Sequence, residues 1–202
     1  NYSIKAALAD SRAFITKYDN PNKRLGDYYE GQEIGEMWGL TTEGFFQTEE
    51  EIKNHADQSA VGEDDQSYKF YVGDLKFADV NGDGKITPDD RTKIGDPTPD
   101  VTYGISLGLS YKNWELSMEM MGQGGNQIYR TWDNYNWAQF NYMEQRLDRW
   151  HGEGTSNTQP LLNTKHAINS ENSEYFIEDG SFFRIRNLQL AYSFDKTLLS
   201  KI

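Results

Sequence analysis

The segment from Tyr103 to Met120 constrains the fold more than any other part of the sequence, because its residues alternate strictly between two kinds. Folded as a hairpin about a two-residue turn at Lys112-Asn113, its two strands have one wholly apolar side. That side pairs Tyr111 with Trp114, Leu109 with Leu116, Leu107 with Met118 and Ile105 with Met120. The other side pairs Ser110 with Glu115, Gly108 with Ser117 and Ser106 with Glu119. A slip of one residue would scramble both sides, so the register is well specified.

Two kinds of fold present a hairpin of this pattern. Strands of roughly ten residues, with aromatic residues near both ends of the apolar stripe and small or polar residues behind it, meet the requirements of a transmembrane β-barrel wall. A half-buried hairpin of a soluble β-sandwich shows the same alternation. The hairpin by itself leaves both folds open.

Composition removes several classes of function. The chain has 202 residues and no cysteine, which excludes disulfides, thiolate metal sites and cysteine nucleophiles. Its formal net charge of -12 argues against a nucleic-acid partner, since phosphate binding needs a basic patch. No apolar run approaches the roughly twenty residues that a membrane helix needs, so any contact with a bilayer would be made by strands.

The order of segments favours the barrel. We expect a strand region over residues 1–18, a transmembrane hairpin over 102–121 and a further strand over 182–195. Between them lie two long polar excursions, residues 20–100 and 122–175. Loops of that length are uncommon in compact soluble domains, whereas outer-membrane barrels combine short turns on one side with long loops on the other.

A calcium-type loop is predicted within the first excursion, in the sequence DVNGDGKITPDD of residues 79–90. Asp79, Asn81 and Asp83 stand at alternate positions, Lys85 offers its backbone carbonyl, and Asp90 closes the loop at the twelfth position. A hard cation takes six to eight oxygens, and this spacing aims several at one centre. The alternative is a pair of plain turns whose acids face water. Thr87 is expected to cap a short helix that carries Asp90.

Catalytic constellations are not evident, and we expect no enzyme. His55, His151 and His166 lie far apart in polar segments and are expected at the surface. Glu178-Asp179 is expected in a turn and Gly122 to Gly125 at the exit of a strand. The aromatic residues of the second excursion could stack on sugar rings or form the private core of a large loop. They are Trp132, Tyr135, Trp137 and Trp150.

Three segments, in this order, resemble signatures of the SusC/RagA-like TonB-dependent outer-membrane transporters of Bacteroidetes. They are YYEGQEIGEMWGLTTEGFFQTEEEI (28–52), GDLKFADVNGDGKITPDDRTKIGDPTPDVTYG (73–104) and SEYFIEDGSFFRIRNLQLAYSF (173–194). The second is the most specific, because it joins the calcium-type loop to a D-R-x-x-I-G-x-P-x-P passage and then to a barrel strand.

The resemblance implies an all-β fold, namely part of a 22-stranded antiparallel transmembrane barrel with a plugged lumen and long extracellular loops. It implies import of oligosaccharides or peptides with energy from TonB, and a SusD-like surface lipoprotein as partner. The plug and the TonB-binding region have no counterpart in the sequence, so the chain is expected to be an internal segment of the C-terminal half. The alternative is a soluble, secreted glycan-binding β-domain with a structural calcium loop.

The resemblance also orients the hairpin. Lys112-Asn113 is expected at the periplasmic rim, with Tyr111 and Trp114 in the inner aromatic girdle and Tyr103 in the outer one, while both excursions lie outside the cell. The lumen-facing set then contains neutral hydrogen-bonding groups with two added carboxylates, which suits a hydrated neutral solute. The set is Ser106, Ser110, Ser117, Asn187 and Gln189, with Glu115 and Glu119.

Overall fold

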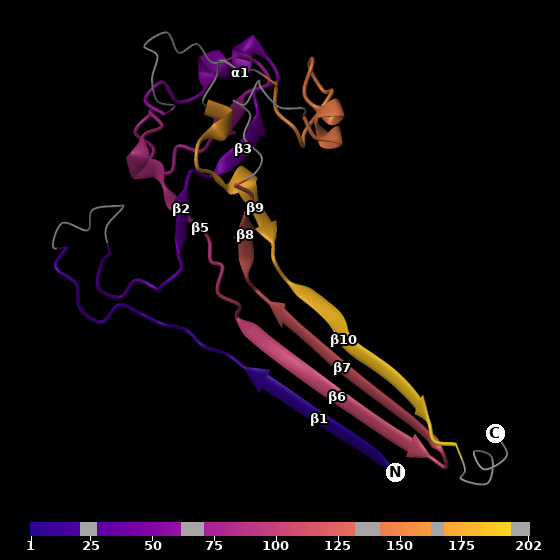
Figure 1. Ribbon diagram of the computed structural model, residues 1–202. Coiled ribbons are helices and arrows are strands. Elements are labelled where there is room, and N and C mark those ends of the chain that lie inside the picture. The colour runs from indigo at the N-terminus through magenta and orange to yellow at the C-terminus, as the bar shows by residue number, and fades with distance from the viewer. Residues whose placement is uncertain (21–27, 62–70, 132–141, 163–167, 195–202) are drawn as a thin grey trace. The chain divides into compact units, whose positions relative to one another are not determined.

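The computed structural model is built mainly from strands and describes residues 1–20, 28–61, 71–131, 142–162 and 168–194. Four long strands form one antiparallel sheet in the order β1-β6-β7-β10 (Figure 1). Their bounds are Tyr2–Ala9 for β1, Val101–Tyr111 for β6, Trp114–Gly124 for β7 and Phe182–Tyr192 for β10. The predicted strand segments therefore assemble into a single sheet.

The central hairpin β6–β7 has the register expected from its alternation. Tyr111 lies opposite Trp114, and the pairing continues without a shift to Val101 opposite Gly124. Lys112 takes a positive φ of 53° to close the turn, a conformation that costs a residue with a Cβ some stability. The period of two along eleven residues fixes this register, because any slip would place polar side chains among the apolar ones.

The two outer strands extend the same alternation. In β1, Ile4 pairs with Leu107 and Lys5 with Ser106, so the apolar side chains of both strands share a face. In β10, Leu188 pairs with Met118, and the register shifts between Ile185 and Asn187. That shift is a β-bulge at Arg186.

The chain divides into two compact units. The first contains residues 1–35, 96–128 and 179–202, and with them the long sheet. The second contains residues 36–95 and 129–178, which come from the two excursions. Its strands are β2 (Met37–Gly39) paired with β5 (Thr92–Gly95), and β3 (Thr42–Phe45) paired with β4 (Leu75–Phe77). The short strands β8 (Gln127–Tyr129) and β9 (Ile177–Asp179) also pair.

Helix is a minor part of the second unit. The one α-helix among the described residues, α1, runs Glu49–Asn54, and the Thr48 hydroxyl caps it by accepting a bond from Glu51 N at 3.2 Å. The Glu51 carboxylate reaches back to Gln47 N at 2.9 Å. Short 3-10 turns complete the unit; they are η1 (Pro88–Asp90), η2 (Glu144–Asp148), η3 (Ile168–Ser170) and η4 (Glu174–Phe176).

The second unit has its own hydrophobic core. Seven buried side chains form it, drawn from both excursions: Leu40, Phe45, Val61, Leu75, Phe77, Ile86 and Ile168. Backbone bonds also join the excursions, since Leu40 N donates to Asn172 O at 2.9 Å and Glu174 N donates to Leu40 O at 2.9 Å. Segments that the sequence presents as two long polar loops therefore fold together as one structured body.

Candidate functional site

The long sheet has an apolar face whose side chains are largely exposed. Tyr2 is 80% exposed, Leu8 76% and Leu190 64%. Further large apolar residues that alternate with polar ones along these strands are exposed to a similar extent, namely Ile4, Leu109, Phe183, Ile185 and Leu188. A face of this size in contact with water would be strongly unfavourable, so it indicates a surface that meets an apolar medium or a partner.

Aromatic side chains gather near both ends of this face. Near the Lys112-Asn113 turn, the Trp114 and Tyr192 rings lie 4.8 Å apart between centroids, and the Tyr192 and Phe194 rings 5.0 Å apart. Toward the other end, Tyr103 stacks on Phe183 with 6.3 Å between centroids. Gly122 makes room for this pair, because a Cβ there would meet the Tyr103 ring. Aromatic belts of this kind are typical of both edges of a membrane-spanning wall.

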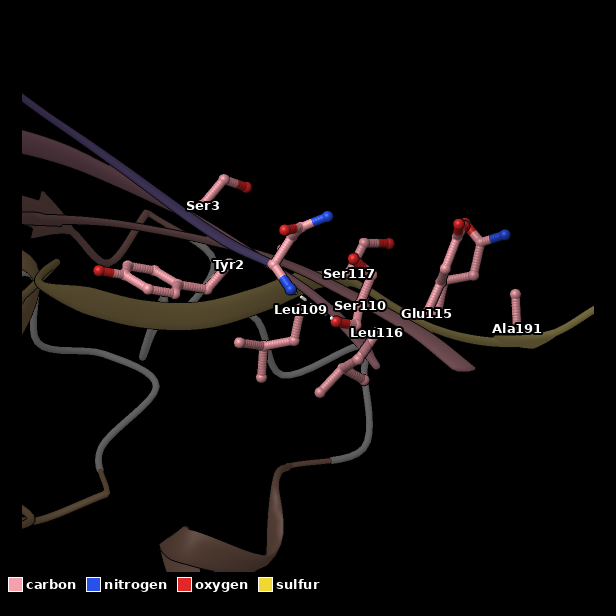
Figure 2. A pocket seen from close by; sticks show the side chains of 11 residues that line it. Tyr2, Ser3, Leu109, Ser110, Glu115, Leu116, Ser117 and Ala191 are labelled. Carbon is pink, nitrogen blue, oxygen red and sulfur yellow. Dashed lines mark hydrogen bonds between the residues drawn. The ribbon is translucent and has the colours of Figure 1, made fainter. Parts of the chain in front are cut away.

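The opposite face of the sheet is polar and grooved. Figure 2 shows Leu109 and Leu116 projecting to one side of the sheet while Ser3, Ser117 and Glu115 project to the other. A groove of about 340 Å³ runs over these strands near their turn end; its lining includes Ser110, Gln189 and Ala191. Every residue of the predicted lumen-facing set lies on strands of this sheet, with the alternation that was expected.

The polar face also carries basic residues that the predicted lumen-facing set does not contain. Lys5 pairs with Ser106 and therefore lies on the same face, and Arg184 pairs with Met121 on that face as well. The predicted set names no basic residue, and the strand pairing adds two to the same face, Lys5 from β1 and Arg184 from the part of β10 before the bulge.

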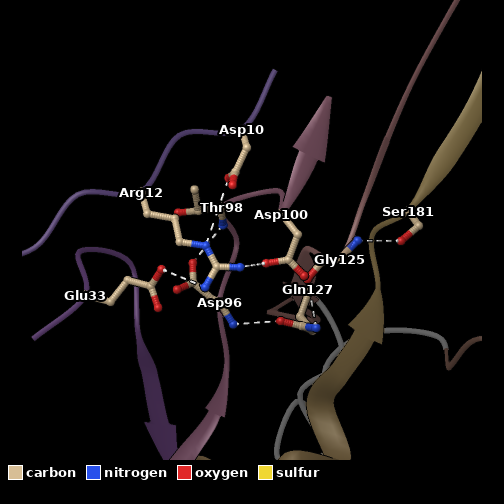
Figure 3. Close-up of polar contacts among 9 residues, drawn as sticks. All are labelled: Asp10, Arg12, Glu33, Asp96, Thr98, Asp100, Gly125, Gln127 and Ser181. Carbon is tan, nitrogen blue, oxygen red and sulfur yellow. Dashed lines mark hydrogen bonds and ion pairs between the residues drawn. The ribbon is translucent and has the colours of Figure 1, made fainter. Parts of the chain in front are cut away.

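A cluster of charged residues surrounds Arg12 in the first unit (Figure 3). The Arg12 guanidinium lies 2.6 Å from the Asp100 carboxylate, 3.9 Å from Glu33 and 4.0 Å from Asp10. Gly125, at φ 86°, lies against Asp100, whose carboxylate occupies the space that a side chain at that position would need. Since Arg12 is 47% exposed, each pair is worth at most about 1 kcal/mol, and the cluster mainly fixes the path of the chain after β1.

The calcium-type loop is closed by hydrogen bonds from its own backbone. Asp79 Oδ1 accepts from Gly82 N at 2.7 Å and Asp79 Oδ2 from Gly84 N at 2.8 Å. Asp90, only 1% exposed, accepts from Val80 N at 3.0 Å and from Thr87 N at 2.8 Å. Thr87 caps η1 as expected, and this cap turns the Asp90 carboxylate back toward the loop.

The remaining predicted ligands take part in the same turns. Asn81 Oδ1 accepts from Asp83 N at 2.9 Å, and Asp83 Oδ1 accepts from Lys85 N at 2.8 Å. Oxygen donors of the kind a hard cation prefers are therefore concentrated in one loop. However, within the described ranges no three acidic or histidine side chains gather closely enough to hold a metal ion. The donor set fits calcium chemically, and in this conformation its side-chain oxygens accept hydrogen bonds from the loop backbone.

The segment that contains Asp57 supports the loop. Asp57 N donates to Gly84 O at 3.0 Å and Ile86 N donates to Asp57 O at 2.8 Å. The Ser59 hydroxyl, followed by the Ser59 backbone N–H, holds the pKa of the Asp57 carboxyl below its ordinary value. The loop is thereby attached to the core of the second unit, in which Ile86 is fully buried.

The predicted aromatic ligand site is only partly described. Trp132, Tyr135 and Trp137 lie outside the described residues. Trp150 is 7% exposed, and its indole N–H donates to Gln47 Oε1 at 3.0 Å. Gly73, at φ 91°, leaves space for the Trp150 ring. These contacts join the two excursions in the interior of the second unit, so Trp150 offers no open face on which a sugar ring could stack.

Two further expectations require correction. His55 is partly buried rather than at the surface: its Nε2 lies 2.8 Å from Phe77 O and its ring packs on Phe46. Glu178 and Asp179 lie in β9 rather than in a turn. By contrast, His151 is exposed, and His166 lies outside the described residues.

A buried polar network was missed by the sequence reasoning. Asn169, only 1% exposed, donates through Nδ2 to Asp74 Oδ1 at 2.9 Å and accepts from Leu75 N at 2.9 Å. Gln58 runs alongside β4, donating to Leu75 O at 2.9 Å and accepting from Phe77 N at 3.2 Å. The network joins the two excursions across the core of the second unit.

Arg130 provides a second link within that unit. Its guanidinium lies 2.9 Å from Glu178 and over the Tyr175 ring, 4.9 Å from the centroid. Burial raises the pKa of the neighbouring Tyr129 hydroxyl, and Glu171 adds to this rise, whereas Arg130 opposes it. Tyr129 therefore stays neutral and donates to Asn172 Oδ1 at 2.9 Å.

In the described part of the chain, no helix has the length and apolar character to cross a bilayer.

Comparison with curated proteins finds TonB-dependent receptors, while no family model matches the chain. The chain is 34% identical over 125 residues to TonB-dependent receptor P26 of Formosa agariphila, covering 60% of this chain and 13% of that receptor. It is 29% identical over 178 residues to receptor P3 of the same organism, covering 85% and 16%. It is 28% identical over 120 residues to TonB-dependent receptor SusC of Bacteroides thetaiotaomicron, covering 58% and 12%. The chain thus spans between 12% and 16% of these relatives.

Comparison with solved structures finds a similar fold in RagAB. The structure of the RagAB peptide transporter matches with a TM-score of 0.62 at 19% identity, over 99% of this chain and 21% of that chain. The RagAB peptide importer in the open-open state matches with a TM-score of 0.59 at 20% identity, over 98% and 21%. At this identity the likeness concerns the fold.

Proposed function

This chain is a SusC/RagA-like segment in sequence and in fold, and from that premise we propose that it forms part of an active transporter of the bacterial outer membrane. In this proposal the long sheet is a portion of a closed 22-stranded barrel. The full receptor imports oligosaccharides or peptides, draws energy from TonB through regions outside this chain, and works with a SusD-like lipoprotein. The role is transport rather than catalysis.

The exposed apolar face of the sheet is the observation that carries the proposal. Its side chains alternate with polar ones over all four strands, and aromatic residues border it near both ends. A barrel wall needs this arrangement, because lipid covers one face and the lumen the other. A soluble domain would have to cover the face, yet Leu188 and Leu190 remain exposed.

The turn and the excursions give the proposed wall a direction. The two-residue turn at Lys112-Asn113 belongs at the periplasmic rim, and the second unit at the cell surface, because short turns and long loops segregate in barrels of this type. At the surface, the excursions would meet the lipoprotein, whose docking is expected to use their aromatic residues. Trp132, Tyr135 and Trp137 remain candidates for ligand contact in this proposal.

Site-directed spin labelling tests the two faces residue by residue. The chain has no cysteine, so Leu190→Cys and the adjacent Gln189→Cys can each carry one nitroxide in a full-length receptor freed of other cysteines. Reconstituted in lipid vesicles, the label at 190 is expected to collide with oxygen, which dissolves in the hydrocarbon. The label at 189 is expected to collide with a water-soluble nickel complex. Equal accessibility at both positions would contradict the barrel.

Calcium binding by residues 79–90 is a second part of the proposal. The donor set is that predicted from the sequence: Asp79, Asn81, Asp83 and Asp90 through side chains and Lys85 through its carbonyl. Each side-chain oxygen that accepts a backbone bond retains further lone-pair capacity, so an ion could bind with small changes in the loop. Its role would be structural, holding the loop against the core of the second unit.

Hydrogen exchange tests the calcium proposal directly. In the full-length receptor, we expect the amides of residues 80–87 to exchange about tenfold more slowly when free calcium is ten times its Kd than with chelator present. Asp83→Ala should remove this response. Asp89→Ala is the matched control, since Asp89 is exposed and follows Pro88 outside the donor set. Identical exchange with calcium and with chelator would exclude the ion.

A further inference from the structure

Asn81 and Gly82 form the only Asn-Gly pair in the sequence, and the pair lies in the loop of residues 79–90. In such a pair the backbone nitrogen of the glycine can attack the side-chain carbon of the asparagine, because glycine has no Cβ to obstruct the approach. Both residues are exposed. A Cβ at Gly82 would have no neighbour within 4 Å among the described residues, so the surrounding structure does not shield the pair.

The reaction of such a pair consumes only water. The Gly82 nitrogen loses its proton and forms a bond to Asn81 Cγ. The bond between Asn81 Cγ and Nδ2 breaks, and the leaving nitrogen takes up a proton and departs as ammonia. Water then opens the cyclic imide at either of its two carbonyls, which gives aspartate or isoaspartate at position 81.

Asp79 restrains the first step of this reaction in the closed loop. Gly82 N donates to Asp79 Oδ1 at 2.7 Å, a short bond typical of a carboxylate acceptor. This bond holds the proton that must leave, and the negative charge of the carboxylate opposes the formation of an anion on the nitrogen. The Asn81 side chain is held as well, since its Oδ1 accepts from Asp83 N at 2.9 Å. Both reacting groups are therefore engaged in hydrogen bonds.

We propose that Asn81 is a site of spontaneous deamidation, that Asp79 suppresses the reaction while the loop is closed, and that opening of the loop releases it. Loops of this kind open locally without unfolding of the whole protein. Because the chemical step is irreversible, the fraction of modified chains records how long the loop has been open.

The product would weaken the attachment of the loop. Isoaspartate adds one carbon to the main chain before Gly82, which displaces Gly82 and Gly84 from the Asp79 carboxylate that accepts a bond from each of them. Gly84 O is also the acceptor of Asp57 N. Deamidation at position 81 therefore changes how the loop is held to the rest of the second unit.

Peptide mapping measures the reaction. Trypsin cleaves after Lys76 and Lys85, so residues 77–85 form one peptide with a single asparagine. The full-length receptor is incubated at neutral pH with chelator, so that calcium binding does not enter, and aspartate and isoaspartate at position 81 are followed by mass spectrometry. We expect the receptor to be modified at least about fivefold more slowly than a synthetic peptide of residues 77–85.

Asp79→Asn isolates the effect of the carboxylate. The variant keeps an acceptor oxygen for Gly82 N but removes the negative charge, and it should speed modification of Asn81 about fivefold. Fragment ions separate position 79 from position 81. Asp89→Asn is the matched control, because it makes the same change of charge in the same loop at an exposed position outside the bonds around Gly82. It should be modified at the wild-type rate.

Hydrogen exchange of the Ile86 amide, which donates to Asp57 O, reports whether the loop stays closed in each variant. If Asp79→Asn opens the loop, its rate should rise to that of the synthetic peptide. Three results would overturn the inference: a wild-type receptor modified as fast as the peptide, Asp79→Asn modified no faster than Asp89→Asn, or an open loop that still reacts at the wild-type rate. None of these outcomes depends on transport or on calcium.

Discussion

Asn169→Leu is expected to lower the unfolding free energy of the second unit by about 3–5 kcal/mol, since leucine has similar volume but no hydrogen-bonding groups. The change removes the acceptor of Leu75 N and one donor to Asp74 Oδ1, in a site where Asn169 is 1% exposed. Each buried polar group that loses its partner costs about 1–3 kcal/mol. Pulse proteolysis of the full-length receptor in urea measures the change.

Asn172→Leu is the matched control for this prediction. Asn172 is exposed, and its side chain accepts one bond, from the Tyr129 hydroxyl at 2.9 Å. Its replacement is expected to cost less than about 1 kcal/mol. If Asn169→Leu and Asn172→Leu shifted the urea midpoint equally, the buried network would not be what joins the two excursions.

Leu188→Arg is expected to destabilise the inserted receptor by about 2–4 kcal/mol, the cost of an arginine near the middle of the lipid-facing side of a barrel. Leu188 lies between Phe183 and Tyr192, which are near opposite ends of the apolar face, and is 62% exposed in this chain. Urea titration in lipid vesicles measures the loss, and the amount of receptor in the outer membrane should fall with it.

The neighbouring Gln189→Arg separates this effect from a general intolerance of charge. Gln189 pairs with Ser117 on the polar face, where water would solvate an added guanidinium. Its replacement is expected to change stability by no more than about 1 kcal/mol. A penalty as large as that of Leu188→Arg would show that the apolar face does not meet lipid.

The sequence was sufficient for features that depend on short-range pattern. The β6–β7 register follows from alternation over eleven residues, and the Thr87 cap follows from neighbouring residues. Asp90 was placed at the closing position of its loop by spacing alone, and its side chain does close the loop, by hydrogen bonds to Val80 N and Thr87 N.

Features that depend on distant residues were not predictable in the same way. Gln58, Asp74 and Asn169 stand in polar stretches, where the general expectation for such residues is the surface. Nothing local indicates that residues 95 apart will share a buried hydrogen bond. Lys5 and Arg184 were missing from the predicted lumen-facing set for a related reason, since placing them on the polar face requires the β1–β6 and β7–β10 pairings.

The origin of the second unit from two separate stretches of chain has a consequence for the order of folding. Asp74 and Asn169 must find each other across a loop that contains the whole β6–β7 hairpin. Once that hairpin has formed, Val101 is held beside Gly124. The loop that the contact between Asp74 and Asn169 must close is then effectively shorter, so closing it costs less chain entropy. The second unit should therefore assemble after the hairpin. A turn at Lys112 that closes slowly would delay formation of the core of the second unit, although Lys112 contributes no side chain to that core.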